Sequence, residues 1–66
     1  MKIGFVGLGN VGSKLAGSLL RNGYEVIVRD LNSEFMSDFV SRGAVAADSP
    51  KQLAQLSDLI ITCLPS

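Results

Sequence analysis

Glycines at a fixed spacing are the first residues in this sequence whose pattern could bind a ligand. Gly7, Gly9 and Gly12 form a Gly-x-Gly-x-x-Gly motif directly after a short apolar run rich in Ile, Phe and Val. Glycine permits a tight turn and leaves backbone amides uncovered, and amides at the start of a helix bind phosphate oxygens. The motif therefore predicts a loop that holds the phosphates of a nucleotide.

The surroundings of the glycine motif point to a dinucleotide. The motif follows a predicted strand and opens a predicted helix, and an acidic residue closes the next strand. Gly7 permits the turn off the strand, Gly9 lets the pyrophosphate approach the backbone, and Gly12 lets the helix pack closely. We expect Asn10 and Val11 to donate their amides to the pyrophosphate. The alternative is a glycine-rich turn that binds nothing.

Asp30, at the end of the second predicted strand, is the candidate for selecting the cofactor. A carboxylate there can accept hydrogen bonds from the ribose hydroxyls of NAD and would repel the extra phosphate of NADP. The alternative is a solvated aspartate or a cap for the following turn. Arg29 would admit NADP if it turned toward the ribose, but neighbours on a strand point to opposite sides. The sequence thus favours NAD over NADP.

The elements that must position these residues alternate between strand and helix. Apolar runs predict strands at residues 2–6, 24–29, 44–47 and 59–64, and helices lie between them. This β-α-β-α-β-α-β order predicts an α/β fold, a Rossmann-type doubly wound parallel sheet with right-handed crossovers. We interpret residues 1–66 as the N-terminal part of a dinucleotide-binding domain, truncated before a functional loop.

The first helix is predicted over residues 11–22, with Asn10 as its N-cap. Gly23 is placed to end this helix in a left-handed conformation. The predicted buried face is made by apolar residues that recur at helical spacing: Val11, Leu15, Ala16, Leu19 and Leu20.

The next two helices have caps of their own. Ser33 is predicted to cap the second helix, whose buried face is Phe35, Met36, Phe39 and Val40. The third helix begins with Ser49 as cap, Pro50 at the first position and Gln52 three residues after the cap, and it ends near Leu56. The last strand is so continuously apolar that we expect it to be covered on both faces.

Charge and composition exclude several classes of function. Six basic and six acidic residues cancel, so no basic face predicts a nucleic-acid or lipid partner. The chain has no histidine, which removes His-based metal and nucleophile sites, and we predict no metal. The single Cys63 is expected to be an inert core thiol, and it fits a reducing compartment such as the cytoplasm, or an organelle matrix. No run is long enough to span a membrane.

Longer stretches of the sequence resemble the β-hydroxyacid dehydrogenase family, which includes 3-hydroxyisobutyrate dehydrogenase and lies in the 6-phosphogluconate dehydrogenase superfamily. The resemblance rests on IGFVGLGNVGSKLAGSLLRNGYEVIVRDLN at residues 3–32, on ADSPKQLAQLSDLI at 47–60 and on the closing TCLPS. It covers essentially the whole chain.

The resemblance implies a set of cofactor-binding residues. It implies that the loop from Gly7 through Leu8, Gly9, Asn10 and Val11 to Gly12 lines the pyrophosphate. Asp30 falls where NAD-preferring members carry an acidic residue, and Leu31 where NADP-preferring members commonly carry Arg. Leu64 and Pro65 match a segment that packs along the adenosine side of the cofactor. These residues are therefore expected to bind NAD: Gly7, Leu8, Gly9, Asn10, Val11, Gly12, Asp30, Leu31, Leu64 and Pro65.

The resemblance also implies which parts of the full-length protein bind the cofactor and which carry out catalysis. Family members transfer hydride between nicotinamide and a hydroxyacid or semialdehyde, using a catalytic lysine and a helical domain that would lie beyond Ser66. We therefore expect no catalytic residue in this chain and a small hydroxyacid substrate only in the full-length parent.

Two other interpretations stay open: a non-catalytic NAD-binding sensor domain, and a related reductase such as pyrroline-5-carboxylate reductase. The exposed edge of the fourth strand predicts self-association.

Overall fold

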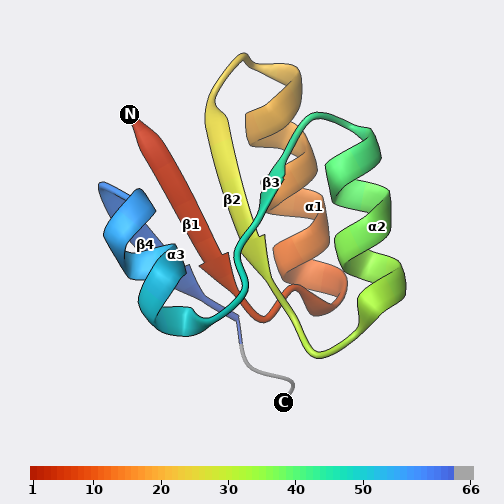
Figure 1. The fold of residues 1–66 in the computed structure, drawn as a ribbon. Helices are drawn as coiled ribbons and strands as arrows, with labels where there is room; N and C mark the ends of the chain where they lie inside the picture. Colours follow the sequence, from red (N-terminus) through yellow and green to blue (C-terminus); the bar gives the residue numbers. More distant parts are fainter. Residues whose placement is uncertain (64–66) are drawn as a thin grey trace.

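The computed structural model describes residues 1–63 and has the predicted alternation of strands and helices (Figure 1). Its layers are one sheet with helices on both sides, as predicted for a doubly wound α/β fold. The elements are β1 (Lys2–Val6), α1 (Gly9–Arg21), β2 (Glu25–Arg29), α2 (Ser33–Ser41), β3 (Val45–Ala46), α3 (Pro50–Leu56) and β4 (Leu59–Thr62).

The sheet has the strand order β3-β2-β1-β4, and each neighbouring pair is parallel. The chain moves outward from β1 through β2 to β3, then crosses back through α3 to place β4 on the other side of β1. The direction of winding therefore reverses between β1 and β4. In open α/β sheets, ligands bind at such a reversal, beyond the carboxyl ends of the strands.

Each face of the sheet has its own hydrophobic core. Helices α1 and α2 lie side by side over one face, and α3 lies over the other (Figure 1). The larger core contains Ile3 and Phe5 from β1, Val26 and Val28 from β2, and Phe39 from α2. The smaller core joins Ile27 of β2 to Leu53 of α3 and to Ala47. Alternate residues of β1 and β2 thus point to opposite faces, which is the ordinary period of a strand.

The prediction for the buried face of α1 was partly wrong. Val11 is 77% exposed and Leu15 is also exposed. The buried residues of this helix are small: Gly12, Ala16 and Gly17. Gly12 lets the helix approach the glycine loop closely, and the large apolar residues one position before Gly12 and Ala16 face outward.

Helix α2 also departs from the sequence prediction at its cap and at one face residue. The N-cap is Asn32, whose side-chain oxygen accepts hydrogen bonds from the amides of Glu34 and Phe35, and Ser33 is the first helical residue. Phe39 is buried as predicted, but Val40 is 47% exposed.

Helix α3 begins as predicted. The Ser49 side chain accepts a hydrogen bond from the Gln52 amide at 3.1 Å, and Pro50 occupies the first turn. The Gln52 side chain accepts a hydrogen bond from the Asp48 amide at 2.5 Å, one residue before the cap. This pair of hydrogen bonds satisfies backbone donors that have no partner inside the helix.

The prediction that the last strand is covered on both faces was wrong. Leu59 and Ile60 of β4 are 47% and 44% exposed, although they point to opposite faces of the sheet. Within residues 1–63, β4 pairs only with β1 and ends the strand order. Apolar side chains on a terminal strand have sheet on one side only, so hydropathy alone overestimated their burial.

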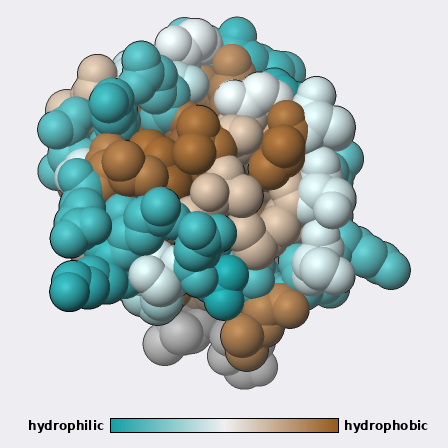
Figure 2. All heavy atoms as spheres, viewed as in Figure 1, coloured by the Kyte–Doolittle hydropathy of each residue, from teal (hydrophilic) through white to brown (hydrophobic). Residues whose placement is uncertain are grey.

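Figure 2 shows the surface in the same orientation as Figure 1, with hydrophobic residues in a band across the middle of the face. None of the helices described in residues 1–63 is both long enough and apolar enough to span a bilayer.

Candidate functional site

A cleft of about 590 Å³ opens where β1 and β2 end. The glycine loop that follows β1 forms one side, and the segment after β2 forms another. This is the reversal point of the sheet, where proteins with open α/β sheets bind their ligands. The residues that line it are Val6, Gly7, Leu8, Gly9, Arg29, Asp30, Leu31, Asn32, Phe35, Pro50 and Cys63.

Gly7 makes the turn that takes the chain off β1. Its φ is +78°, a backbone conformation that residues other than glycine rarely adopt. Its amide donates a hydrogen bond to the Arg29 carbonyl oxygen at 2.9 Å. A Cβ at Gly7 would run into the carbonyl oxygen of Cys63. The loop is therefore fixed between the ends of β2 and β4, with no room for a side chain.

Gly12 sits where α1 packs against this loop. A Cβ there would lie 3.1 Å from both Cβ and Sγ of Cys63 and 3.2 Å from the Gly7 carbonyl oxygen. These distances are tighter than ordinary carbon contacts, so the absence of a side chain lets the helix approach the turn. This arrangement confirms the packing role predicted for the third glycine.

Gly9 differs from the other two glycines of the motif. Its φ is +55°, and a Cβ built on it would have nothing within 4 Å. The space next to this backbone is open in a loop that is otherwise closely packed. That is the room a phosphate group needs to approach the amides of the first turn of α1.

Helix α1 begins at Gly9, so the prediction that Asn10 is its N-cap was wrong. Leu8 takes the N-cap position and makes no side-chain capping hydrogen bond. Its side chain is buried in the larger core. Asn10 and Val11 are both exposed and lie in the first turn, where backbone amides have no acceptor within the helix.

Asp30 connects the end of β2 to the glycine loop. Its Oδ2 accepts a hydrogen bond from the Leu8 amide at 2.6 Å, and its Oδ1 accepts one from the Asn32 amide at 2.8 Å. The carboxylate is thus held at the mouth of the cleft and also stabilises the turn before α2. The ligand-binding and turn-capping interpretations of Asp30 are compatible, since each oxygen retains a second lone pair.

Leu31 also lies at the cleft and is 98% exposed. Leu64 and Pro65, which were expected to contact the adenosine side, lie outside the described residues.

Sequence reasoning missed several residues of the cleft, among them Phe35, Pro50 and Cys63. Pro50 and Cys63 follow β3 and β4, and the ends of parallel strands meet at one edge of the sheet. That topological rule could have identified them. Cys63 was predicted to be a core thiol; it is half-buried, packs against the larger core and also borders the cleft. Arg29 was assigned to the opposite side of the strand, although it lines the same cleft as Asp30.

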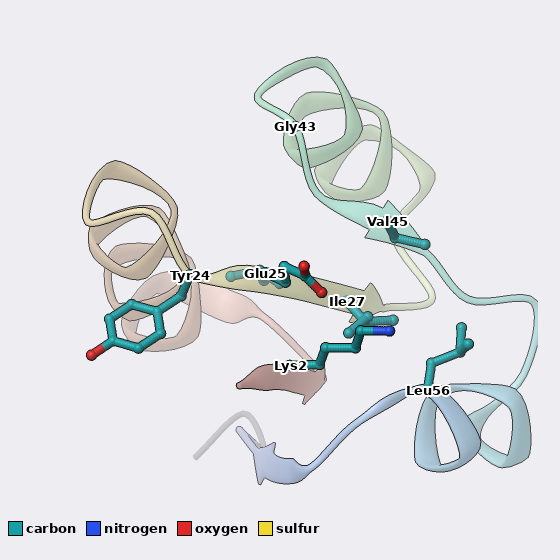
Figure 3. Close-up of a pocket in the computed structure, with 8 residues that line it drawn as sticks. Lys2, Tyr24, Glu25, Ile27, Gly43, Val45 and Leu56 are labelled. Atoms are coloured by element: carbon teal, nitrogen blue, oxygen red, sulfur yellow. The ribbon is translucent and has the colours of Figure 1, made fainter.

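A second hollow, of about 240 Å³, lies at the other end of the sheet (Figure 3). Lys2 and Ile27 extend from the strands into it, between Val45 of β3 and Leu56 of α3. It lies at the amino ends of β1 and β2, where open α/β sheets do not hold their ligands. The cleft at the glycine loop is therefore the candidate functional site.

Comparison with curated proteins gives relatives that act on small hydroxyacids and aldehydes. Mouse 3-hydroxyisobutyrate dehydrogenase, named as mitochondrial, is 41% identical over 97% of this chain and 19% of its own length. The 3-sulfolactaldehyde reductase of Escherichia coli is 42% identical over 97% of this chain and 22% of its own length. The chain therefore spans about a fifth of these relatives.

Solved structures show the same fold with dinucleotides bound. An imine reductase variant from Myxococcus stipitatus in complex with NAD+ has a TM-score of 0.90 at 25% identity. A reductive aminase from Aspergillus terreus in complex with NADPH has a TM-score of 0.88 at 28% identity. Each comparison covers 96% of this chain and 22% of the other chain.

A family model, the NAD-binding domain of 6-phosphogluconate dehydrogenase, matches residues 2–66, nearly the whole sequence. The Rossmann-like sheet and the glycine loop at its reversal point agree with this match. The chain belongs to the family of the NAD-binding domain of 6-phosphogluconate dehydrogenase.

Proposed function

We propose that this chain holds NAD in the cleft at the glycine loop, as the cofactor-binding part of an oxidoreductase that acts on a hydroxyacid or a semialdehyde. The observation that carries the proposal is the open space at Gly9, in a loop where Gly7 and Gly12 leave no room for side chains. A closely packed turn with one bare, accessible backbone position suits a pyrophosphate group.

The proposed contacts follow from the geometry of the loop. The exposed first turn of α1 offers the amides of Asn10 and Val11 to the pyrophosphate, aided by the positive end of the helix dipole. The Leu8 amide is already engaged by Asp30, so it serves to hold that carboxylate rather than to bind phosphate. The remaining lone pairs of the Asp30 carboxylate accept hydrogen bonds from the ribose hydroxyls.

NAD is proposed as the preferred dinucleotide because Asp30 is fixed at the mouth of the cleft and Leu31 carries no charge. An anchored carboxylate disfavours a second anion beside it. When bound, the nicotinamide supplies the hydride chemistry, and this chain's residues bind and orient the cofactor. We propose that substrate binding and catalysis belong to other parts of the parent protein, so residues 1–66 alone are expected to give no turnover.

Nuclear magnetic resonance tests the location of the ligand. We expect titration of the ¹⁵N-labelled chain with NAD to shift the amide signals of Gly9, Asn10, Val11 and Leu31. We expect weak binding, so the NAD concentration is raised to roughly 10 mM. At this concentration a binding free energy of about −3 kcal/mol still gives measurable shifts. Shifts confined to Lys2, Val45 and Leu56 would place the ligand in the second hollow and refute the proposal.

We also propose that residues 1–66 form the N-terminal part of a larger dinucleotide-binding domain and that copies of this chain associate through β4. Leu59 and Ile60 are exposed on a strand that has a described neighbour on one side only. Exposed apolar strand edges pair with other strands. Sedimentation should show association that Ile60→Lys reduces, and a stable monomer at high concentration would contradict this.

A location in the cytoplasm or in an organelle matrix is proposed, and the mouse relative is mitochondrial by name.

A further inference from the structure

The side chain of Arg29 is a cation at the cleft that takes part in none of the contacts described so far. It is the last residue of β2, it is half-buried, and it lines the cleft beside Asp30 and Leu31. The rule that strand neighbours point to opposite sides fails here because β2 ends at Arg29, so Asp30 already belongs to the turn. Both residues therefore reach the same cleft.

The charge of Arg29 is not matched by a carboxylate in the described part of the chain. The ion pair found among residues 1–63 joins Arg42 to Asp38 on α2. Arg29 donates one hydrogen bond, from Nη1 to the Ala47 carbonyl oxygen, at a long 3.4 Å. The carboxylate of Asp30 is turned toward two backbone amides instead. The guanidinium group thus has several free donors at the edge of the cleft.

We propose that Arg29 is a second determinant of cofactor choice, which binds the 2′-phosphate of NADP and so lets the cleft accept NADP beside NAD. The inference rests on the proposed function, since it requires the adenosine ribose to lie at Asp30. A guanidinium group with free donors pairs well with phosphate, often through two parallel hydrogen bonds. Asp30 and Arg29 together contribute no net charge, so the repulsion that a lone carboxylate would exert on the 2′-phosphate is reduced, which lets NADP bind although NAD is preferred.

The long hydrogen bond to Ala47 orients the guanidinium group toward one side of the cleft. Ala47 follows β3, and its carbonyl holds Nη1 at the side of the cleft formed by the β3–α3 segment, near Pro50. One donor is used for positioning, and the others stay available. Arg29 is half-buried as a residue, which fits a side chain whose aliphatic stem lies on apolar surface while its charged head group stays at the cleft.

The test compares NAD and NADP titrations of ¹⁵N-labelled chains. The unmodified chain is expected to bind NAD more tightly than NADP, but by no more than about threefold, or about 0.6 kcal/mol. Arg29→Gln should weaken NADP binding about tenfold, as expected for loss of a charge-assisted hydrogen bond, and leave NAD binding unchanged. Arg29→Lys should retain part of the NADP affinity. Arg21→Gln, which removes an exposed cation at the end of α1, should change neither.

The possible failures are distinguishable. If NAD binds at the glycine loop but Arg29→Gln leaves the ratio of the two constants unchanged, the role of Arg29 is wrong and the proposed function stands. If Arg29→Gln weakens both dinucleotides equally, Arg29 supports the cleft without selecting the phosphate, and the inference is likewise overturned. If neither dinucleotide shifts the loop amides, the proposed function fails and this inference fails with it.

Discussion

The replacement of Gly9 by alanine separates ligand binding from folding. Gly9 and Gly23 both have positive φ angles, +55° and +84°, and a Cβ at either position would meet nothing within 4 Å. Placing an L-residue in the left-handed region costs about 1–2 kcal/mol, so Gly9→Ala and Gly23→Ala should destabilise the fold equally. A domain of this length is expected to have about 3–10 kcal/mol of stability, so both variants should remain folded.

The two variants should differ in affinity for the dinucleotide. The methyl group of Gly9→Ala enters the space that the pyrophosphate is proposed to occupy, whereas Gly23 follows the far end of α1. A methyl group forced into a close contact costs about 1–3 kcal/mol, which corresponds to roughly a 5- to 150-fold increase in the dissociation constant for NAD. Gly23→Ala should bind NAD as the unmodified chain does.

Urea denaturation followed by circular dichroism measures the stability of each variant, and NMR titration with NAD measures its affinity. Wild-type affinity in Gly9→Ala would refute the reasoning, because the phosphates could not then lie against this backbone. Equal loss of affinity in both variants would show that the effect comes from weakened folding and not from occupied space.

Further substitutions test packing and capping by urea denaturation. Gly4→Ala should destabilise the fold by about 1–3 kcal/mol, because its Cβ would clash with the Ser57 hydroxyl and lie 2.7 Å from a methyl of the buried Leu53 side chain; unchanged stability would contradict the packing of α3 on β1. Gly17→Ala should stabilise α1 by about 0.5–1 kcal/mol, since its Cβ would meet only the flexible ends of arginine side chains at 3.4 Å or more, and a loss of stability would show that the helix has no room there. Asn32→Ala should cost about 1 kcal/mol through loss of the N-cap and Ser33→Ala much less; the reverse order would restore Ser33 as the cap.

The local features of the site could be predicted from the sequence because they depend on neighbouring residues. The alternation of strand and helix follows from hydrophobic period, and the turn at Gly7 follows from the need for a positive φ directly after a strand. The cap of α3 was predicted correctly because Ser49, Pro50 and Gln52 interact within one turn. Parallel pairing follows from the alternation of strands and helices, whereas the strand order β3-β2-β1-β4, with its reversal beside β1, is seen only in the structure.

Other features depended on contacts between segments that are far apart in the chain. The buried face of α1 is set by the approach of Gly12 to Cys63, and periodicity could not distinguish it from the face that carries Val11. The placement of Arg29 in the cleft depends on where β2 ends and on the carbonyl of Ala47. A sequence specifies which backbone positions can bend and which side chains are apolar. Which groups meet across the cleft is decided by packing, because the distances between separate segments are set only when both cores form.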